Sequence, residues 1–175
     1  MIVAIKGARN TGKTTFIERL LEKLHDYKVV VIKSSEHERI DEDGKDTFRY
    51  RKAGGIASVM IMKEESVIFM KSMELEDAVS FVARKFSPDF IIVEGNKSVE
   101  TLKCRVVDMA EKPDVEQVYN DMVRSIKRRR MEIFIDGKKL PMNEFVERLM
   151  YNTIKAMLST LKRGEGKEAE ILIKE

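Results

Sequence analysis

The chain is poor in the residues that build disulfide frameworks and metal sites. It contains one cysteine, Cys104, and two histidines, His25 and His37. A single cysteine excludes internal disulfides and is typical of proteins kept in a reducing cytoplasm. The same shortage argues against a structural zinc site and against a metal-inserting function, because both need clusters of cysteine and histidine ligands.

Long hydrophobic runs and an excess of charge of one sign are also missing. No apolar run approaches the ~20 residues of a membrane-spanning helix, and the opening MIVAIKG is too short for a signal peptide. The 33 basic and 30 acidic residues leave a net charge of only +3, which does not favour nucleic-acid binding. We therefore expect a cytoplasmic protein with neither a membrane nor a nucleic-acid partner.

Strand-like and helix-like hydrophobic patterns alternate along most of the chain. Apolar runs at 2–5, 29–34 and 89–95 have the length of buried strands, and helical stripes occur within 16–24 and 75–86. Further strand-like runs occupy 57–63, 66–71 and 102–109, and a further helical stripe occupies 115–126. The alternation predicts an α/β fold in which a mostly parallel sheet carries helices on both faces.

The pattern changes from about residue 131. Asp136 and Gly137 stand between two short extended runs, which is a strong signal for a β-hairpin turn. A long helical stripe and a final alternating segment, 169–175, follow. We expect a nucleotide-binding domain over 1–130. Residues 131–175 would be its hairpin–helix–strand extension, which either lengthens the main sheet or forms a small appended layer.

The segment GARNTGKTT, residues 7–15, follows the first predicted strand directly. Gly7, Gly12, Lys13 and Thr14 match G-x-x-x-x-G-K-[ST], the phosphate-binding P-loop. The glycines let backbone N–H groups point at an anion, the lysine adds positive charge near the β- and γ-phosphates, and the threonine hydroxyl can ligate Mg²⁺. The strand–loop–helix setting is the one that this motif requires, so the sequence predicts a P-loop NTPase fold with a nucleotide site.

An acidic residue at the end of another predicted strand is suited to metal chemistry. The apolar strand DFIIVEG, residues 89–95, ends in Glu94. In P-loop proteins a carboxylate at such a strand end lies beside the Mg²⁺ ion and the attacking water. We therefore predict Thr14 and Glu94 as metal-side residues, and Lys13 and Glu94 as the residues that act in catalysis.

Three segments together resemble one family. The P-loop, GKDTFRYRKAG (44–54) and DFIIVEGNK (89–97) are similar to the motifs of MobB, the molybdopterin-guanine dinucleotide biosynthesis adapter proteins. The resemblance covers roughly residues 1–110, and the tail from 131 resembles the archaeal variant. It implies that the phosphate loop consists of Gly7, Ala8, Arg9, Asn10, Thr11, Gly12, Lys13, Thr14 and Thr15. Asp46, Arg51, Lys52, Gly54 and Lys97 occupy the other motif positions, of which Asp46, Arg51 and Lys97 are expected to bind the nucleotide.

The resemblance also implies a function and partners. Members of this family are expected to bind GTP with Mg²⁺, to hydrolyse it weakly, to form homodimers, and to assist the guanylyltransferase MobA in attaching a nucleotide to molybdopterin. This chain departs from the family by having KSSEHE where a His-rich KHTHHD is common. It also lacks an N-K-x-D guanine-reading segment, so the choice of GTP rests on the resemblance alone.

Three alternatives stay open on the sequence. The acidic stretch 36–46, which should lie outside the core as a long loop, either supplies a metal-side carboxylate or is merely solvated. The acidic residues in the first part of this stretch are Glu36, Glu38, Asp41, Glu42 and Asp43. The KRRR run, 127–130, either docks a phosphate-bearing pterin or a nucleic acid, or is a solvated helix end. A small P-loop kinase is the alternative function, with Arg49 and Arg51 acting over the transferred phosphate.

Overall fold

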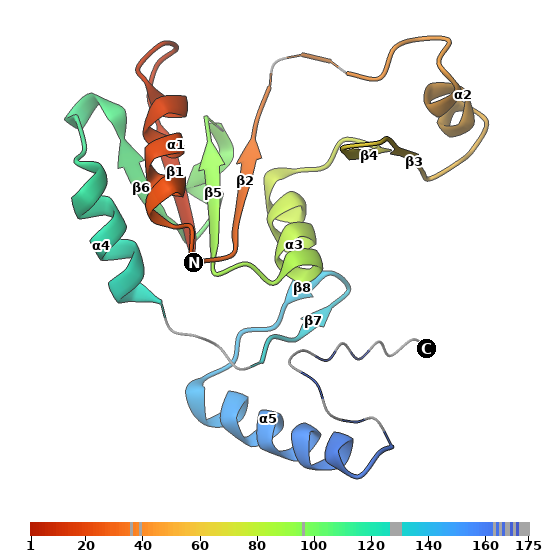
Figure 1. The fold of residues 1–175 in the computed structure, drawn as a ribbon, viewed down its shortest axis with the longest axis vertical. Helices are drawn as coiled ribbons and strands as arrows, with labels where there is room; N and C mark the ends of the chain where they lie inside the picture. The colour runs from red at the N-terminus through yellow and green to blue at the C-terminus, as the bar shows by residue number, and fades with distance from the viewer. Residues whose placement is uncertain are drawn as a thin grey trace. The chain divides into compact units, whose positions relative to one another are not determined.

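A computed structural model describes residues 1–35, 37–38, 40–95, 97–126 and 131–162, together with residues 164, 166, 169 and 171. The chain forms two compact units, Met1–Ile126 and Lys127–Glu175. Figure 1 labels their helices and strands. Within the described residues, no helix has the length and apolar character needed to cross a membrane.

The first unit is organised around a four-stranded sheet. Its strands are β1 (Ile2–Lys6), β2 (Val29–Lys33), β5 (Phe90–Glu94) and β6 (Arg105–Asp108). They lie in the order β2-β5-β1-β6 and every neighbouring pair is parallel. Ile5 pairs with Glu94, and Lys33 pairs with Glu94 from the other side. The carboxyl ends of the strands therefore meet at one edge, which confirms the expected parallel sheet.

Helices cover both faces of this sheet. Helices α1 (Lys13–Lys23) and α4 (Val115–Ser125) pack on one face, where Leu20 and Met122 are completely buried with Ile5. Helix α3 (Leu75–Phe86) and the 3₁₀ helix η1 (Lys97–Thr101) pack on the other, around Ala4. Adjacent residues of β1 thus serve opposite cores, as the twofold period of a strand requires. Each fully buried large apolar side chain contributes about 1.5–3 kcal/mol, so α1 is held firmly against the sheet.

A hairpin and a short helix stand apart from the parallel sheet. Helix α2 (Asp46–Lys52) is followed by Ala53 as its C-cap and by Gly54 with φ 111°, so a glycine follows the end of this helix. Strands β3 (Ala57–Ile61) and β4 (Ser66–Met70) then pair antiparallel in a two-stranded sheet of their own. The sequence predicted both strands, but it did not predict that they pair with each other outside the main sheet.

The second unit contains a hairpin and a helix. Strands β7 (Phe134–Ile135) and β8 (Lys138–Lys139) are joined by Asp136 and Gly137, both with positive φ, as the turn signal predicted. The described part of the chain pairs these strands only with each other. Helix α5 (Glu144–Ser159) begins after Asn143, whose side chain accepts a hydrogen bond from the Val146 N–H at 2.9 Å. Most of the predicted final strand, and the whole KRRR run, lie outside the described residues.

Candidate functional site

The loop between β1 and α1 contains three residues with positive φ angles. Gly7, Asn10 and Gly12 have φ angles of 154°, 64° and 79°. At Gly7 a Cβ atom would lie 2.6 Å from Thr11 Oγ1 and 2.9 Å from Met109 Cβ, closer than non-bonded atoms pack. Only glycine fits there without a shift of the loop, which explains the first glycine of the motif in physical terms.

The start of α1 is open for a negatively charged group. Gly12 is the N-cap residue and makes no side-chain capping bond, and the first turn of the helix contains no acidic residue. The residues from Gly7 to Gly12 are all exposed. Because the N-terminus of a helix carries a partial positive charge, an accessible end without a side-chain cap favours phosphate.

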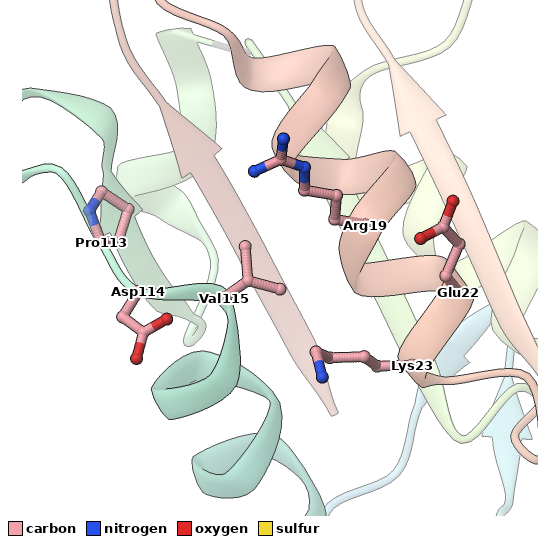
Figure 2. Close-up of a pocket in the computed structure, with 6 residues that line it drawn as sticks. All are labelled: Arg19, Glu22, Lys23, Pro113, Asp114 and Val115. Atoms are coloured by element: carbon pink, nitrogen blue, oxygen red, sulfur yellow. The ribbon is translucent and has the colours of Figure 1, made fainter.

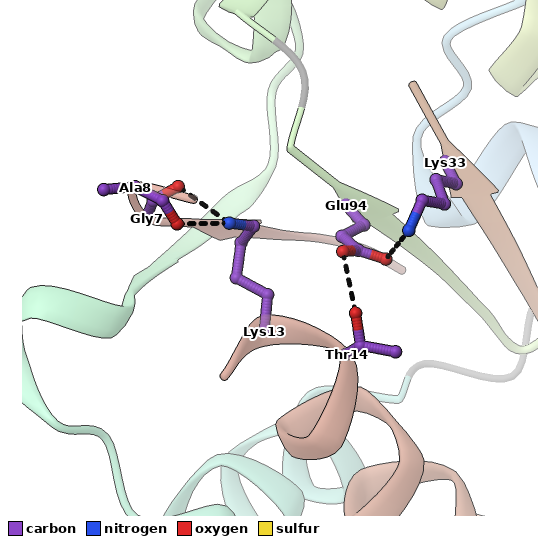
Figure 3. A network of polar contacts seen from close by, with 6 residues as sticks. All are labelled: Gly7, Ala8, Lys13, Thr14, Lys33 and Glu94. Atoms are coloured by element: carbon purple, nitrogen blue, oxygen red, sulfur yellow. Dashed lines mark hydrogen bonds and ion pairs between the residues drawn. The ribbon is translucent and has the colours of Figure 1, made fainter. Parts of the chain in front are cut away.

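Lys13 folds back over its own loop. Its ammonium group donates hydrogen bonds to the Gly7 carbonyl at 2.9 Å and to the Ala8 carbonyl at 2.6 Å (Figure 3). The Thr11 hydroxyl also donates to the Ala8 carbonyl, at 2.8 Å. The lysine charge therefore lies directly over the segment whose amides would face a phosphate chain.

Glu94 joins the loop to the neighbouring strand. The residue is only 8% exposed, although it ends β5. Its Oε1 accepts a hydrogen bond from the Thr14 hydroxyl at 3.2 Å, and its Oε2 lies 3.5 Å from Lys33 Nζ (Figure 3). These partners offset the cost of burying a carboxylate. The structure thus brings together the two residues that the sequence placed beside a metal.

The donor set at this point suits magnesium. A threonine hydroxyl and a carboxylate are hard oxygen ligands, and Mg²⁺ is usually held by one or two such groups together with waters and substrate phosphates. Across the described residues there is no group of three or more His, Cys, Asp or Glu side chains arranged to hold a metal. A site that relies on Thr14, Glu94 and a phosphate ligand fits both observations.

Two residues at this site escaped the sequence reasoning. Lys33 contacts Glu94 because β2 lies beside β5, although the two residues are 61 positions apart. Met109 limits the space at Gly7 because β6 lies beside β1 and the 3₁₀ helix η2 (Met109–Glu111) follows it. Both residues lie near the ends of predicted strands, but only the order of the strands in the sheet shows which residues Lys33 and Met109 contact.

The other motif residues lie elsewhere or make contacts of their own. Arg51 Nη2 lies 2.5 Å from the Asp41 carboxylate, and Asp46 pairs with Arg49 at 3.4 Å. These contacts stay within the α2 segment and do not extend to the phosphate loop. Lys52 ends α2, and Lys97 begins η1, three residues after Glu94. Binding of the nucleotide by Asp46, Arg51 and Lys97 stays a prediction.

Asp41 corrects the expectation for the acidic stretch. The expectation that 36–46 lies wholly outside the core is wrong at this residue, which is only 6% exposed. Its Oδ1 accepts a hydrogen bond from the Thr47 hydroxyl at 2.7 Å, while Oδ2 pairs with Arg51. A paired carboxylate can be buried where an isolated one cannot, so Asp41 fixes the end of the loop to α2. Glu36 lies outside the described residues.

A hollow of about 540 Å³ lies along α1, away from the phosphate loop. Arg19, Glu22 and Lys23 line it from α1, and Pro113, Asp114 and Val115 line it from the segment that enters α4 (Figure 2). Lys23 forms an ion pair with Glu116 beside it, and this hydrogen-bonded carboxylate raises the pKa of Lys23. The hollow has mixed charge and contains none of the predicted nucleotide-binding residues.

Comparison with known proteins identifies the family. The family model for molybdopterin guanine dinucleotide synthesis protein B, MobB, matches residues 2–127. A Bacillus subtilis protein named "Probable molybdopterin-guanine dinucleotide biosynthesis adapter protein" is 31% identical over 147 residues, which cover 80% of this chain and 83% of that protein. A Methanocaldococcus jannaschii protein, provisionally named for the same adapter role, is 26% identical over 216 aligned residues and covers 92% of each chain.

A solved structure of a MobB homologue from Bacillus stearothermophilus covers 70% of this chain and 98% of its own, with 14% identity and a TM-score of 0.46. The family match itself extends from the first strand to the end of α4 and includes the phosphate loop and Glu94. The chain therefore belongs to the MobB family.

Proposed function

We propose that the chain is a GTP-binding adapter protein with weak Mg²⁺-dependent GTPase activity that assists the synthesis of molybdopterin guanine dinucleotide. The adapter role is supported by the names of its relatives. The observation that carries the nucleotide proposal is the 3.2 Å contact between Thr14 and Glu94, which joins the phosphate loop to the end of β5. A hydroxyl and a carboxylate within hydrogen-bond distance of each other beside the phosphate loop support a metal site next to bound phosphates.

Each residue of the site would have a separate task. The amides of the loop and the ammonium group of Lys13 would bind the β- and γ-phosphates, because both present positive charge. Thr14 and Glu94 would hold Mg²⁺, and Glu94 would also orient the attacking water. The metal supplies neutralisation of the charge that develops on the phosphates during hydrolysis.

The proposals for the nucleotide base and for the partners rest on membership of the family. GTP is proposed because the relatives are named for a guanine dinucleotide product, and MobA with molybdopterin are the proposed partners. The alternative function, a small kinase, would use Arg49 and Arg51 over the transferred phosphate. Both arginines instead pair with carboxylates of their own segment, so this site offers no observation that favours it.

Replacement of Lys13 tests the proposal. Lys13→Ala should weaken GTP binding by at least ~10-fold, because a charged hydrogen-bond donor to phosphate is lost. The fold should be unchanged, since the ammonium group donates its hydrogen bonds to carbonyls of the exposed loop. Titration calorimetry with GTP and with ATP, in the presence of Mg²⁺, measures both the affinity and the base preference. Equal affinities for the variant and the parent would refute the site, and steady turnover that depends on a phosphate acceptor would favour the kinase.

A homodimer is also proposed, and helix α5 supports it. The helix contains no buried residue, and Phe145, Leu149 and Met157 on its apolar stripe are 65%, 56% and 65% exposed. A stripe of this kind normally packs against another apolar surface, and a second copy of the chain supplies an identical one. Light scattering at micromolar concentration should give twice the monomer mass, and Leu149→Lys should halve it. Asn152→Lys, an equal change on an exposed polar residue of the same helix, should leave the mass unchanged.

A further inference from the structure

Lys33 is a charged residue at the site to which the proposed function gives no task. Its ammonium group lies 3.5 Å from Glu94 Oε2, while Glu94 Oε1 is bound by Thr14. The Lys33 side chain is 63% exposed, whereas the Glu94 side chain is 11% exposed. An ion pair with one exposed partner is weak and easily exchanged, so Lys33 is free to find another anion.

The strand order places Lys33 on one side of Glu94 and the phosphate loop on the other. Along the carboxyl edge the order is β2, β5, β1, and adjacent strands are about 4.8 Å apart. The backbone of Lys33 is therefore roughly 10 Å from the end of β1, where the loop begins. A phosphate chain that starts in the loop and passes Glu94 would bring only its last group within reach of Lys33.

Metal binding would change what Lys33 faces. Its single positive charge is balanced by Glu94 in the structure. A divalent cation beside Thr14 and Glu94 would repel the nearby ammonium group, because like charges at such distances interact strongly in a partly buried site. The terminal phosphate of a bound triphosphate brings the negative charge that the lysine then needs.

We propose, on the basis of the nucleotide-binding function above, that Lys33 leaves Glu94 for the terminal phosphate when Mg²⁺ and a nucleoside triphosphate bind. Lys33 then determines the preference of the site for triphosphate over diphosphate. Lys13 is less selective, because its ammonium group lies over the loop and would contact the β-phosphate that both nucleotides carry as well as the γ-phosphate. Lys33 would thus report whether the last phosphate is present.

A purely structural role for Lys33 makes a different prediction. If the lysine only balances the buried charge of Glu94, removing it should lower the melting temperature of the nucleotide-free protein. Affinities for diphosphate and triphosphate would then change by the same factor. The ratio of the two dissociation constants therefore separates the two roles, since stability alone does not move it.

The test compares Lys33→Met, which keeps the length of the side chain and removes its charge, with Lys85→Met. Lys85 is an exposed lysine in the last turn of α3, before β5 begins and so near the opposite edge of the sheet. Dissociation constants for GDP and for a non-hydrolysable GTP analogue are measured by calorimetry with Mg²⁺. In Lys33→Met we expect the triphosphate preference to fall roughly tenfold, with GDP affinity within about twofold of the parent. Lys85→Met should keep the parental ratio.

The outcomes separate this inference from the proposed function. A parental ratio in Lys33→Met, or a parent that binds both nucleotides equally, overturns the role of Lys33 while nucleotide binding stands. Failure of the parent to bind either nucleotide overturns both. If Lys33→Met does not fold, Lys33→Gln replaces it, and Lys33→Arg should retain most of the preference because it keeps the positive charge.

Discussion

The space around Gly7 gives a prediction whose magnitude follows from the structure. A Cβ at this position would lie 2.9 Å from Met109 Cβ, roughly 0.6 Å closer than the ~3.5 Å at which carbon atoms pack. Gly7 also has φ 154°, a backbone conformation that residues other than glycine rarely adopt. Gly7→Ala therefore combines overpacking, at about 1–3 kcal/mol, with backbone strain, at about 1–3 kcal/mol.

The expected loss of stability is thus about 2–6 kcal/mol, a large share of the ~5–15 kcal/mol that stabilises an ordinary domain. Urea unfolding measures it, and at an m-value of ~2 kcal/mol/M a 4 kcal/mol loss lowers the midpoint by roughly 2 M. Gly54→Ala is the matched control, because Gly54 has φ 111° but no atom within 4 Å of an added Cβ. It should show the strain contribution without the contact with Met109.

Met109→Gly in the Gly7→Ala background tests the contact itself. It removes the Cβ atom that the new methyl group meets. The double variant should therefore lose less stability than the two single variants together, by about 1 kcal/mol or more. Equal losses for Gly7→Ala and Gly54→Ala, with no coupling to Met109, would refute the packing argument. GTP affinity of folded Gly7→Ala should also fall, because the loop must shift to admit the methyl group.

Three further predictions concern single residues. Glu94→Gln should leave metal-free GTP binding little changed but lower single-turnover hydrolysis with Mg²⁺ by roughly 10²-fold, whereas a lower melting temperature with unchanged hydrolysis would show a structural role. Asp41→Ala leaves Arg51 without its carboxylate in a largely buried site and should cost roughly 3 kcal/mol in urea unfolding; an unchanged midpoint would contradict this. Burial raises the pKa of the Cys104 thiol, so alkylation at pH 8 should be slower in the folded protein than in urea, and equal rates would exclude the shift.

Local sequence determined the elements that carry the site. The glycines and lysine of GARNTGKTT specify a loop and a helix start because backbone freedom and dipole depend only on adjacent residues. The apolar run that ends in Glu94 specified a buried strand, and Asp136-Gly137 specified a hairpin turn, for the same reason. The alternation of strands and helices then fixed the fold class, since parallel strands need helical crossovers.

Tertiary structure decided which residues meet at the site. Lys33 faces Glu94, and Met109 limits Gly7, because of the strand order β2-β5-β1-β6, which no local pattern encodes. Asp41 is buried, although the other described residues of its acidic segment are exposed, because Thr47 and Arg51 reach it from α2. The acidic composition of the segment predicted that the Asp41 carboxylate would be exposed to solvent. Its two specific partners allow it to be buried instead. Contacts between distant segments depend on the register and order of the strands, and these are set only when the whole sheet has assembled.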